Sequence, residues 1–187
     1  MRIIGGALRG LKLAEVGAGD RGAHLRPTSD RVREAIFNLL INGGYGDPVR
    51  GARVLDLFAG TGALGLEALS RGADSVVFLD TGAASGALIR RNIDLCRAGD
   101  RAVLLKRDAL RPGPVDGASA GLVFLDPPYG KGLGGRALEA AAQAGWIATG
   151  AVIVWEELAE QVAPPGFARL DARRYGDTWV TLLEAMA

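Results

Sequence analysis

The spacing of apolar positions changes along this chain of 187 residues. Residues 1–15 alternate loosely between apolar and polar positions, which is typical of short strands or a hairpin. Residues 16–26 are rich in glycine and predict a loop. Between residues 27 and 42 apolar side chains recur at helical spacing, a polar N-cap is available at 28–30, and Gly43-Gly44 end the pattern. The first part of the chain therefore predicts a small β extension followed by one helix.

From residue 52 onward, strand and helix patterns alternate. Five continuous apolar runs predict buried parallel strands at 54–58, 76–79, 103–105, 122–125 and 151–155. Helical patterns lie between them at 63–71, 84–97 and 132–145. Two further strands are expected near 167–175 and 178–185, where an antiparallel hairpin at the sheet edge is the simplest interpretation. The pattern predicts an α/β fold with a mostly parallel, doubly wound sheet.

Composition narrows the class of protein. With 49% hydrophobic and 23% charged residues, the chain is typical of one soluble globular domain. It has one cysteine and one histidine, Cys96 and His24, so we expect no intramolecular disulfide and no metal site built on these residue types. We find neither an apolar run of the roughly 20 residues that span a bilayer nor a signal-peptide pattern, and we expect a cytoplasmic protein without membrane contact.

The net charge of +1 conceals an uneven distribution. Residues 1–33 contain seven basic and three acidic side chains, and 19 of the 22 basic residues of the chain are arginine. The planar guanidinium suits phosphate and base recognition, although a bias toward arginine can also reflect genome composition. The asymmetry alone leaves nucleic-acid binding open.

A glycine-rich turn follows the first expected buried strand. Gly60-x-Gly62-x-x-Gly65 satisfies the dinucleotide fingerprint, and Asp80 follows Gly60 by twenty positions, near the spacing of a ribose-binding acid. Glycines allow close backbone approach to a ligand, and the helix N-terminus exposes free N–H groups. The motif alone fits an NAD(P) enzyme and a nucleoside-cofactor methyltransferase equally well.

Three aspartates follow or end expected strands, and the first of them, Asp56, favours the nucleoside-cofactor methyltransferase. Asp56, just before the glycines, would repel a pyrophosphate but suits the ammonium and sulfonium of S-adenosylmethionine; alternatively it only caps the turn. Asp80 can accept both ribose hydroxyls or cap the next helix. Asp108, after the third strand, can accept the adenine amino group or serve as a turn aspartate.

A second motif, Asp126-Pro127-Pro128-Tyr129, ends the fourth expected strand. The exocyclic amine of a base is a poor nucleophile, and Asp126 together with the Pro127 carbonyl can accept its two N–H groups and favour the geometry that attacks a methyl group. Prolines fix the backbone before the substrate arrives, and Tyr129 offers a face for a flipped base. The alternative is a plain strand-ending turn. A covalent mechanism through Cys96 is disfavoured because Cys96 lies in a helical stretch, and Glu156-Glu157 are expected to open a helix.

Several motifs in one order resemble the RsmD family of bacterial 16S rRNA guanine-N2 methyltransferases, named for guanine 966. They are Arg2-Ile3-Ile4-Gly5-Gly6, Arg9-Gly10, Arg26-Pro27-Thr28-x-Asp30-Arg31-Val32-Arg33-Glu34-Ala35-Ile36-Phe37-Asn38, Asp56–Gly65 with Leu66-Glu67-Ala68-Leu69-Ser70-Arg71-Gly72-Ala73, and Asp126-Pro127-Pro128-Tyr129. The resemblance spans nearly the whole chain, and the Arg-Pro-Thr segment is its specific part. It implies a Rossmann-like class I methyltransferase domain at 27–187, preceded by a basic β-hairpin extension at 1–26 that contacts RNA.

The resemblance also implies a set of site residues. It assigns the acceptor amine and base to Asp126–Tyr129, and it implies an assembled 30S subunit as substrate. The candidate cofactor contacts are Asp56, Phe58, Ala59, Gly60, Thr61, Gly62, Asp80, Asp108 and Ala109. The candidate RNA contacts are Arg2, Arg9, Lys12, Arg26 and Arg31. The family usually has glutamate at position 80 and an acid at position 82, where this chain has Asp80 and Gly82.

Other functions remain open on the residues alone. Asp-Pro-Pro-Tyr does not distinguish guanine N2 from adenine N6, so an adenine-N6 DNA or RNA methyltransferase is the first alternative. An NAD(P)-dependent oxidoreductase rests on the glycine fingerprint alone. A non-catalytic RNA-binding assembly factor would keep the fold without turnover. In each case we expect a monomer without a metal.

Overall fold

The computed structural model describes residues 1–15 and 29–187. Its helices are α1 (Asp30–Asn42), α2 (Ala63–Ser70), α3 (Ala83–Leu95) and α4 (Leu133–Gln143). Its strands are β1 (Arg53–Leu57), β2 (Ser75–Leu79), β3 (Ala102–Leu105), β4 (Ala120–Leu125), β5 (Ile147–Glu157), β6 (Phe167–Tyr175) and β7 (Thr178–Ala185). Apart from the helix expected to open at Glu156-Glu157, each element predicted from residue 27 onward is present, and most of the predicted boundaries lie within two residues of the observed ones.

The seven strands form one sheet in the order β3-β2-β1-β4-β5-β7-β6. The first five of these strands are parallel to one another, and β7 runs antiparallel to both β5 and β6. The C-terminal hairpin therefore lies at the sheet edge as predicted, but with its second strand inside. Burial explains the order: β7 contributes the fully buried Val180, Leu182 and Leu183, whereas β6 carries exposed residues along its length.

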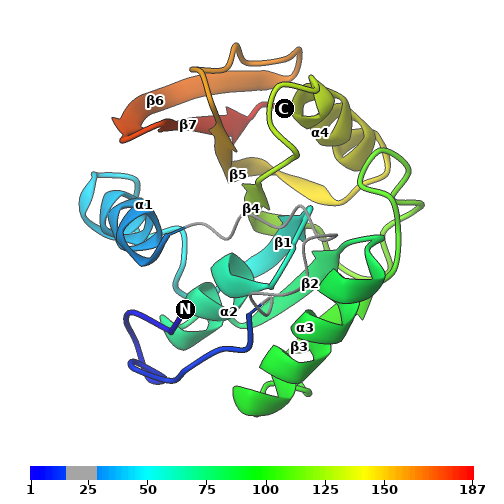
Figure 1. The fold of residues 1–187 in the computed structure, drawn as a ribbon. Helices are drawn as coiled ribbons and strands as arrows, with labels where there is room; N and C mark the ends of the chain where they lie inside the picture. The colour runs from blue at the N-terminus through cyan, green and yellow to red at the C-terminus, as the bar shows by residue number, and fades with distance from the viewer. Residues whose placement is uncertain (16–28) are drawn as a thin grey trace.

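Helices cover both faces of the sheet, as in a Rossmann-like methyltransferase fold (Figure 1). One core cluster joins α1, α2 and α3 to the sheet and includes Phe37 of α1, whose ring centroid is 5.6 Å from that of Phe124 on β4. The second cluster packs Ala137, Leu138 and Ala141 of α4 against the opposite face. No helix in the described ranges is long and apolar enough to cross a membrane.

The N-terminal segment 1–15 makes a narrow hairpin that packs along α2 (Figure 1). A single antiparallel bridge joins Arg2 to Lys12, and Ile3 is buried in the core of the main domain. The buried carboxylate of Glu67, on α2, accepts the backbone N–H groups of Ile4 and Gly5, both at 2.8 Å. The extension is thus held by α2 through hydrogen bonds as well as apolar contact.

Three buried residues, Cys96, Glu156 and Glu157, lie where the sequence did not specify their surroundings. Cys96 is 5% exposed at the end of α3, and burial raises the pKa of its thiol to about 11, which agrees with a core position. Glu156 and Glu157 do not open a helix. They are the last two residues of β5, and both are buried. The prediction for this pair was wrong because β5 continues past its apolar run to pair with β7.

Candidate active site

The strand order reverses direction between β1 and β4, which are neighbours although two strands separate them in sequence. Ligands of open α/β sheets bind at the carboxyl ends of strands at such a switch point. Leu57 at the end of β1 is in register with Leu125 at the end of β4. The glycine-rich turn after β1 and the Asp126 motif after β4 therefore meet at one edge of the sheet.

The glycine-rich turn uses left-handed backbone at three positions. The φ angles of Phe58, Gly60 and Gly62 are 58°, 57° and 75°, and the Gly62 N–H closes the turn on the Ala59 carbonyl at 2.7 Å. Gly62 is the N-cap of α2. A Cβ at Gly65 would lie 2.7 Å from Val76, so this glycine permits α2 to pack closely on β2. The turn matches the geometry that the fingerprint predicts.

Asp56 is 2% exposed and accepts the N–H of Gly65 through Oδ2 at 3.0 Å. The capping role considered from the sequence is therefore present. Burial raises the pKa of this carboxyl well above its usual range; the Gly65 hydrogen bond opposes the rise, and the charges of Asp126 and Asp80 add to it. Among the described residues, Asp56 makes no ion pair with a cationic side chain. Its surroundings therefore favour a cationic ligand.

Asp80 joins the glycine-rich turn to the next loop. Its Oδ2 accepts the Gly60 N–H at 2.9 Å and its Oδ1 accepts the Gly82 N–H at 2.7 Å. Gly82 is the N-cap of α3, so Asp80 supports the start of that helix as well as the turn. Both oxygens keep a further lone pair after these bonds, which a ribose hydroxyl could use.

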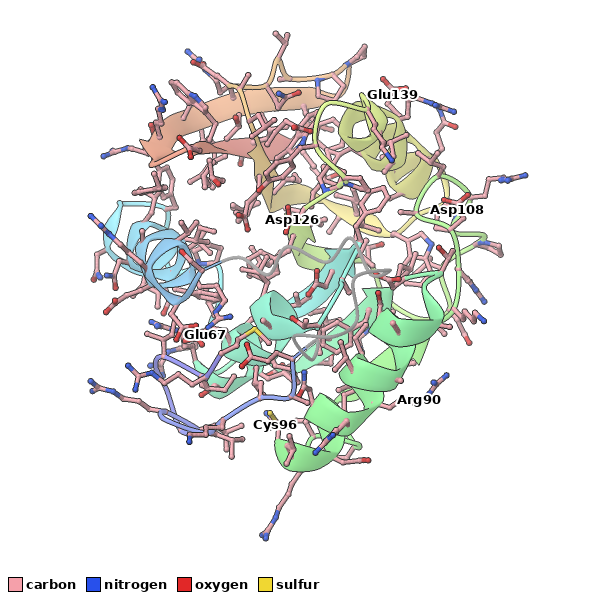
Figure 2. All side chains as sticks on the ribbon, in the orientation of Figure 1. Glu67, Arg90, Cys96, Asp108, Asp126 and Glu139 are labelled. Carbon is pink, nitrogen blue, oxygen red and sulfur yellow. The ribbon has the colours of Figure 1, made fainter. Side chains whose placement is uncertain are left out.

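Asp108 occupies a turn, as the plainer of its two readings predicted. Its Oδ1 accepts the Leu110 N–H at 2.9 Å, and Arg111 lies 3.8 Å from its other oxygen. The next residue, Ala109, is buried in the core cluster on the α4 face. Figure 2 shows Asp108 at the rim of the molecule and Asp126 near its centre, so the two aspartates lie in clearly different parts of the sheet edge.

The Asp126-Pro127-Pro128-Tyr129 segment leaves β4 with Pro127 buried, Pro128 exposed, and Asp126 and Tyr129 half-buried. It is fastened from β5, because the N–H of Gly130 donates to Oε1 of Glu157 at 3.0 Å. Glu157 also accepts the N–H of Leu158. This carboxylate therefore holds the motif in place from the neighbouring strand.

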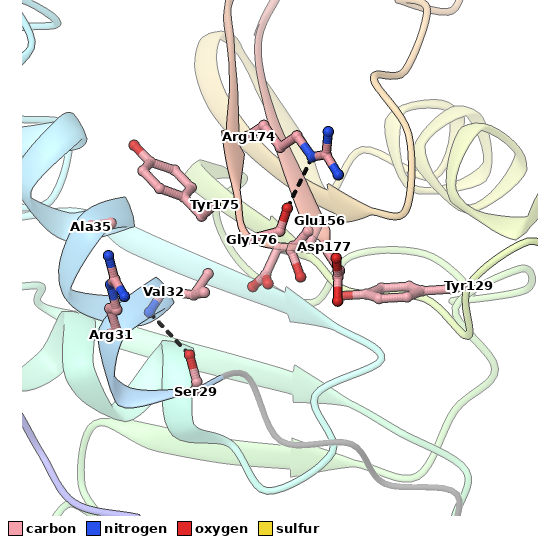
Figure 3. A pocket seen from close by; sticks show the side chains of 11 residues that line it. Ser29, Arg31, Val32, Ala35, Tyr129, Glu156, Arg174, Tyr175, Gly176 and Asp177 are labelled. Carbon is pink, nitrogen blue, oxygen red and sulfur yellow. Dashed lines mark hydrogen bonds between the residues drawn. The ribbon is translucent and has the colours of Figure 1, made fainter.

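A pocket of about 470 Å³ opens beside this motif (Figure 3). Tyr129 forms one side, and the N-terminal turns of α1, including Arg31 and Val32, form the other. Glu156 from β5, Arg174 from the end of β6 and Asp177 from the turn between β6 and β7 are among the other polar residues that line it. Sequence reasoning included Tyr129 and Arg31 but missed Glu156 and Arg174, because their approach depends on the order of β5, β7 and β6.

The predicted RNA-binding residues separate into two regions. Arg2, Arg9 and Lys12 are exposed on the N-terminal hairpin. The tip of that hairpin lies at the C-terminal end of α2, where the N–H of Ala7 donates to the Ser70 carbonyl at 2.7 Å. Because α2 runs back from the site, this tip lies toward the opposite edge of the sheet, whereas Arg31 lines the pocket. Arg26 and His24 lie outside the described residues.

No group of three or more histidine, cysteine, aspartate or glutamate side chains suited to a metal occurs in residues 1–15 or 29–187.

Comparisons with known proteins agree on one family. Residues 1–184 match the family described as Conserved hypothetical protein 95. The chain is 37% identical over 164 residues to ribosomal RNA small subunit methyltransferase D of Escherichia coli, covering 88% of this chain and 78% of that protein. It is 39% identical over 132 residues to YlbH of Bacillus subtilis, provisionally named an rRNA methyltransferase, covering 69% and 67% of the two chains. A solved structure from Escherichia coli, provisionally named methyltransferase yhhF, superposes with a TM-score of 0.81 at 33% identity, covering 100% of this chain and 98% of that one.

Proposed function

The chain belongs to the Conserved hypothetical protein 95 family, the RsmD family, and on that premise we propose that it methylates ribosomal RNA. The reaction is transfer of a methyl group from S-adenosylmethionine to the exocyclic N2 amine of a guanine, position 966 of 16S rRNA. The observation that carries the proposal is the meeting of the Asp56 turn and the Asp126 motif at the switch point of the sheet. The names of the two curated relatives support the rRNA substrate.

Asp126 and Pro127 act on the acceptor amine. The Asp126 carboxylate and the Pro127 carbonyl accept the two N–H groups of the amine, which directs its lone pair toward the methyl donor. The proline pair and the hydrogen bond from Gly130 to Glu157 hold these acceptors before the base arrives. Tyr129 offers its ring to the base. Catalysis by such residues is positioning and hydrogen bonding, and it needs no covalent intermediate.

The residues at the end of β1 fit the proposed cofactor. Burial raises the pKa of the Asp56 carboxyl, and the charges of Asp126 and Asp80 add to the rise; a ligand ammonium would offset this excess of negative charge. The turn formed by Phe58–Gly62 would approach the cofactor closely with its backbone. Asp80 would accept the ribose hydroxyls, and Asp108 with Ala109 would border the adenine. S-adenosylmethionine supplies an activated methyl group when bound.

The remaining parts of the proposal concern the assembly. The N-terminal residues Arg2, Arg9 and Lys12, with Arg26 and Arg31, contact phosphates of the RNA. The substrate is the 30S subunit rather than free 16S rRNA, and the enzyme acts in the cytoplasm as a monomer without a metal.

The test is transfer of labelled methyl from S-adenosylmethionine to 30S subunits that lack small-subunit RNA methylation, with nucleoside digestion to identify the product. We expect N2-methylguanosine at one site. Asp126→Ala should reduce the rate about a hundredfold or more while cofactor binding persists, because Asp126 acts on the amine. Glu139→Ala, an exposed carboxylate on the outer side of α4, is the matched control and should keep the wild-type rate (Figure 2).

Three results would decide against parts of the proposal. Methyl transfer by Asp126→Ala at the wild-type rate would show that the Asp126 motif does not have the proposed catalytic role. N6-methyladenosine as product would replace the guanine with an adenine. Cofactor binding without labelled RNA would keep the fold and redirect the search to DNA or protein acceptors.

A further inference from the structure

Building on the proposed function, we propose that the pocket beside Tyr129 receives the target nucleotide and that Glu156 selects guanine over adenine. The Asp126 motif alone treats the amine of either base in the same way. A second group that reads the ring next to the amine is needed for a choice. Glu156 is the buried carboxylate that lines the pocket at the correct edge of the sheet.

The strand register places Glu156 beside the acceptor motif. Leu125 at the end of β4 pairs with Trp155 of β5, so Asp126 and Glu156 are the next residues on two adjacent parallel strands. Side chains alternate between sheet faces, and Trp155 belongs to the cluster on the α4 face. Glu156 therefore points to the α1 face, where its antiparallel partner Val180 is buried. This is the face on which α1 borders the pocket.

The lining of the pocket matches the parts of a nucleotide. Tyr129 offers an aromatic face at one side, and the exposed guanidinium groups of Arg31 and Arg174 lie at the rim (Figure 3). Arg174 is oriented by donation from Nε to the Gly176 carbonyl at 2.9 Å, which leaves its terminal nitrogens for a phosphate. The volume of about 470 Å³ lies within the usual range for small-molecule sites.

Acidic groups also line this pocket, and they argue against a site for a bare anion. Asp177 is exposed at the rim and Glu156 lies inside, so the two arginines are balanced by two carboxylates. A ligand with hydrogen-bond donors at one end and a phosphate at the other fits this distribution. A guanine nucleotide has that form, because N1–H and the N2 amine are adjacent donors on its Watson–Crick edge.

The same carboxylate disfavours adenine. Adenine presents N1 as an acceptor beside its N6 amine, so a carboxylate facing that edge would meet a lone pair where guanine offers a hydrogen. In our assignment Asp126 takes one N2 hydrogen while Glu156 takes N1–H. Selection of guanine N2 over adenine N6 is thus made by Glu156 on β5 and not by the Asp126 motif that follows β4.

The test uses a base that keeps the N2 amine but lacks the N1 hydrogen. 30S subunits are reconstituted with guanosine or 2-aminopurine riboside at the target position, and kcat/KM for methyl transfer is measured for both. We expect the wild-type protein to prefer guanosine by roughly ten- to hundredfold. In Glu156→Gln, the new amide can donate to N1 of 2-aminopurine, and the preference should fall to about threefold or less.

Controls separate selection from folding and from general loss of activity. Both substrates are measured on one protein sample, so a partly folded variant leaves their ratio unchanged. Glu156→Asp, which keeps a carboxylate, and Glu139→Gln, on the outer side of α4, should both retain a preference for guanosine. Arg31→Ala and Arg174→Ala should raise KM for both substrates alike, because they contact the phosphate.

An equal guanosine preference in the wild-type protein and in Glu156→Gln would overturn the assignment of Glu156 while the proposed function stands. Equal KM values for the wild-type protein and both arginine variants would show that the target nucleotide does not bind in this pocket. Failure of the wild-type protein to methylate guanosine-bearing subunits would instead overturn the proposed function on which the assignment rests.

Discussion

At the scale of single residues, the site is organised by carboxylates that bind backbone N–H groups. Asp56 holds the first turn of α2, Asp80 joins the glycine-rich turn to α3, and Glu157 fastens the Asp126 motif. These bonds link strands, turns and helix starts that meet at the carboxyl edge of the sheet. Two of these carboxylates, Asp56 and Asp80, are also residues that we propose to contact the cofactor.

Burial of Asp56 predicts a specific dependence of stability on pH. Its folded pKa is raised above the ordinary value near 4, so the folded protein binds this proton more tightly than the unfolded chain does. The resulting contribution to the free energy of unfolding is complete below about pH 4 and is lost as the pH rises through the folded pKa. The loss approaches about 1.4 kcal/mol per pH unit within that window.

Asp56→Asn should remove this dependence, because asparagine cannot ionise but still offers an oxygen to the Gly65 N–H. Urea unfolding of both proteins between pH 3.5 and 8 measures the effect, and the variant should gain stability relative to wild type as the pH rises. Asp108→Asn, the same change at a half-buried turn aspartate, controls for the substitution. Parallel curves for the wild-type protein and Asp56→Asn would contradict the account.

At the scale of elements, two adjacent glycines show how closely α4 packs on the sheet. A Cβ at Gly134 would lie 2.6 Å from Nε1 of Trp155 on β5, inside van der Waals contact, whereas a Cβ at Gly135 would lie 3.7 Å from the same ring. Trp155 is 4% exposed and is surrounded by core residues, so its ring has little room to move. Gly134 is therefore required by the contact between α4 and β5.

These glycines provide a matched pair of variants. Gly134→Ala should lower the free energy of unfolding by about 1–3 kcal/mol through overpacking. Gly135→Ala should raise it by about 0.5 kcal/mol, because alanine favours the helix and the contact is ordinary. Urea denaturation of the two variants is the measurement. Equal effects of the two substitutions would show that Trp155 does not limit the approach of α4.

At the scale of the whole molecule, the basic side chains form two separate surfaces. Arg9 and Lys12 lie on the N-terminal hairpin, which follows α2 away from the site. Arg31 and Arg174 border the pocket. A ribosomal subunit is large enough to reach both surfaces, and they should contribute differently: the hairpin to affinity, the pocket to placement of one nucleotide.

Replacing Arg9 and Lys12 together with alanine should weaken binding to 30S subunits. The slope of log K against log salt concentration should fall in magnitude by about 1.5, because two phosphate contacts are lost. The affinity for S-adenosylmethionine should not change. Arg53 and Arg101, exposed at the amino ends of β1 and β3, form a control pair of equal charge, and their replacement should leave the slope as it was. An unchanged salt slope in the hairpin variant would show that this segment does not contact the RNA.

The order of helices and strands and the two motifs at strand ends could be predicted from the sequence. Helical and strand spacings are local properties, and the carboxyl ends of parallel strands meet at one edge whatever the details of packing. The glycine-rich turn and Asp126–Tyr129 were located for this reason. The N-cap of α1 was narrowed to three residues, and the structure selects Ser29, whose Oγ accepts the Val32 N–H.

Other features depend on contacts between distant segments, and only the tertiary structure decided them. Glu156 was expected in a helix, but pairing of β5 with β7 extends the strand and buries this carboxylate at the pocket. The insertion of β7 between β5 and β6 likewise brings Arg174 to the same pocket. The raised pKa of Asp56 follows from burial and from the acidic residues that come directly after two other strands, Asp126 after β4 and Asp80 after β2. Local spacing in the sequence identifies which residues end a strand. The burial of those residues and their neighbours in space depend on how the strands pair, which is determined only in the tertiary structure.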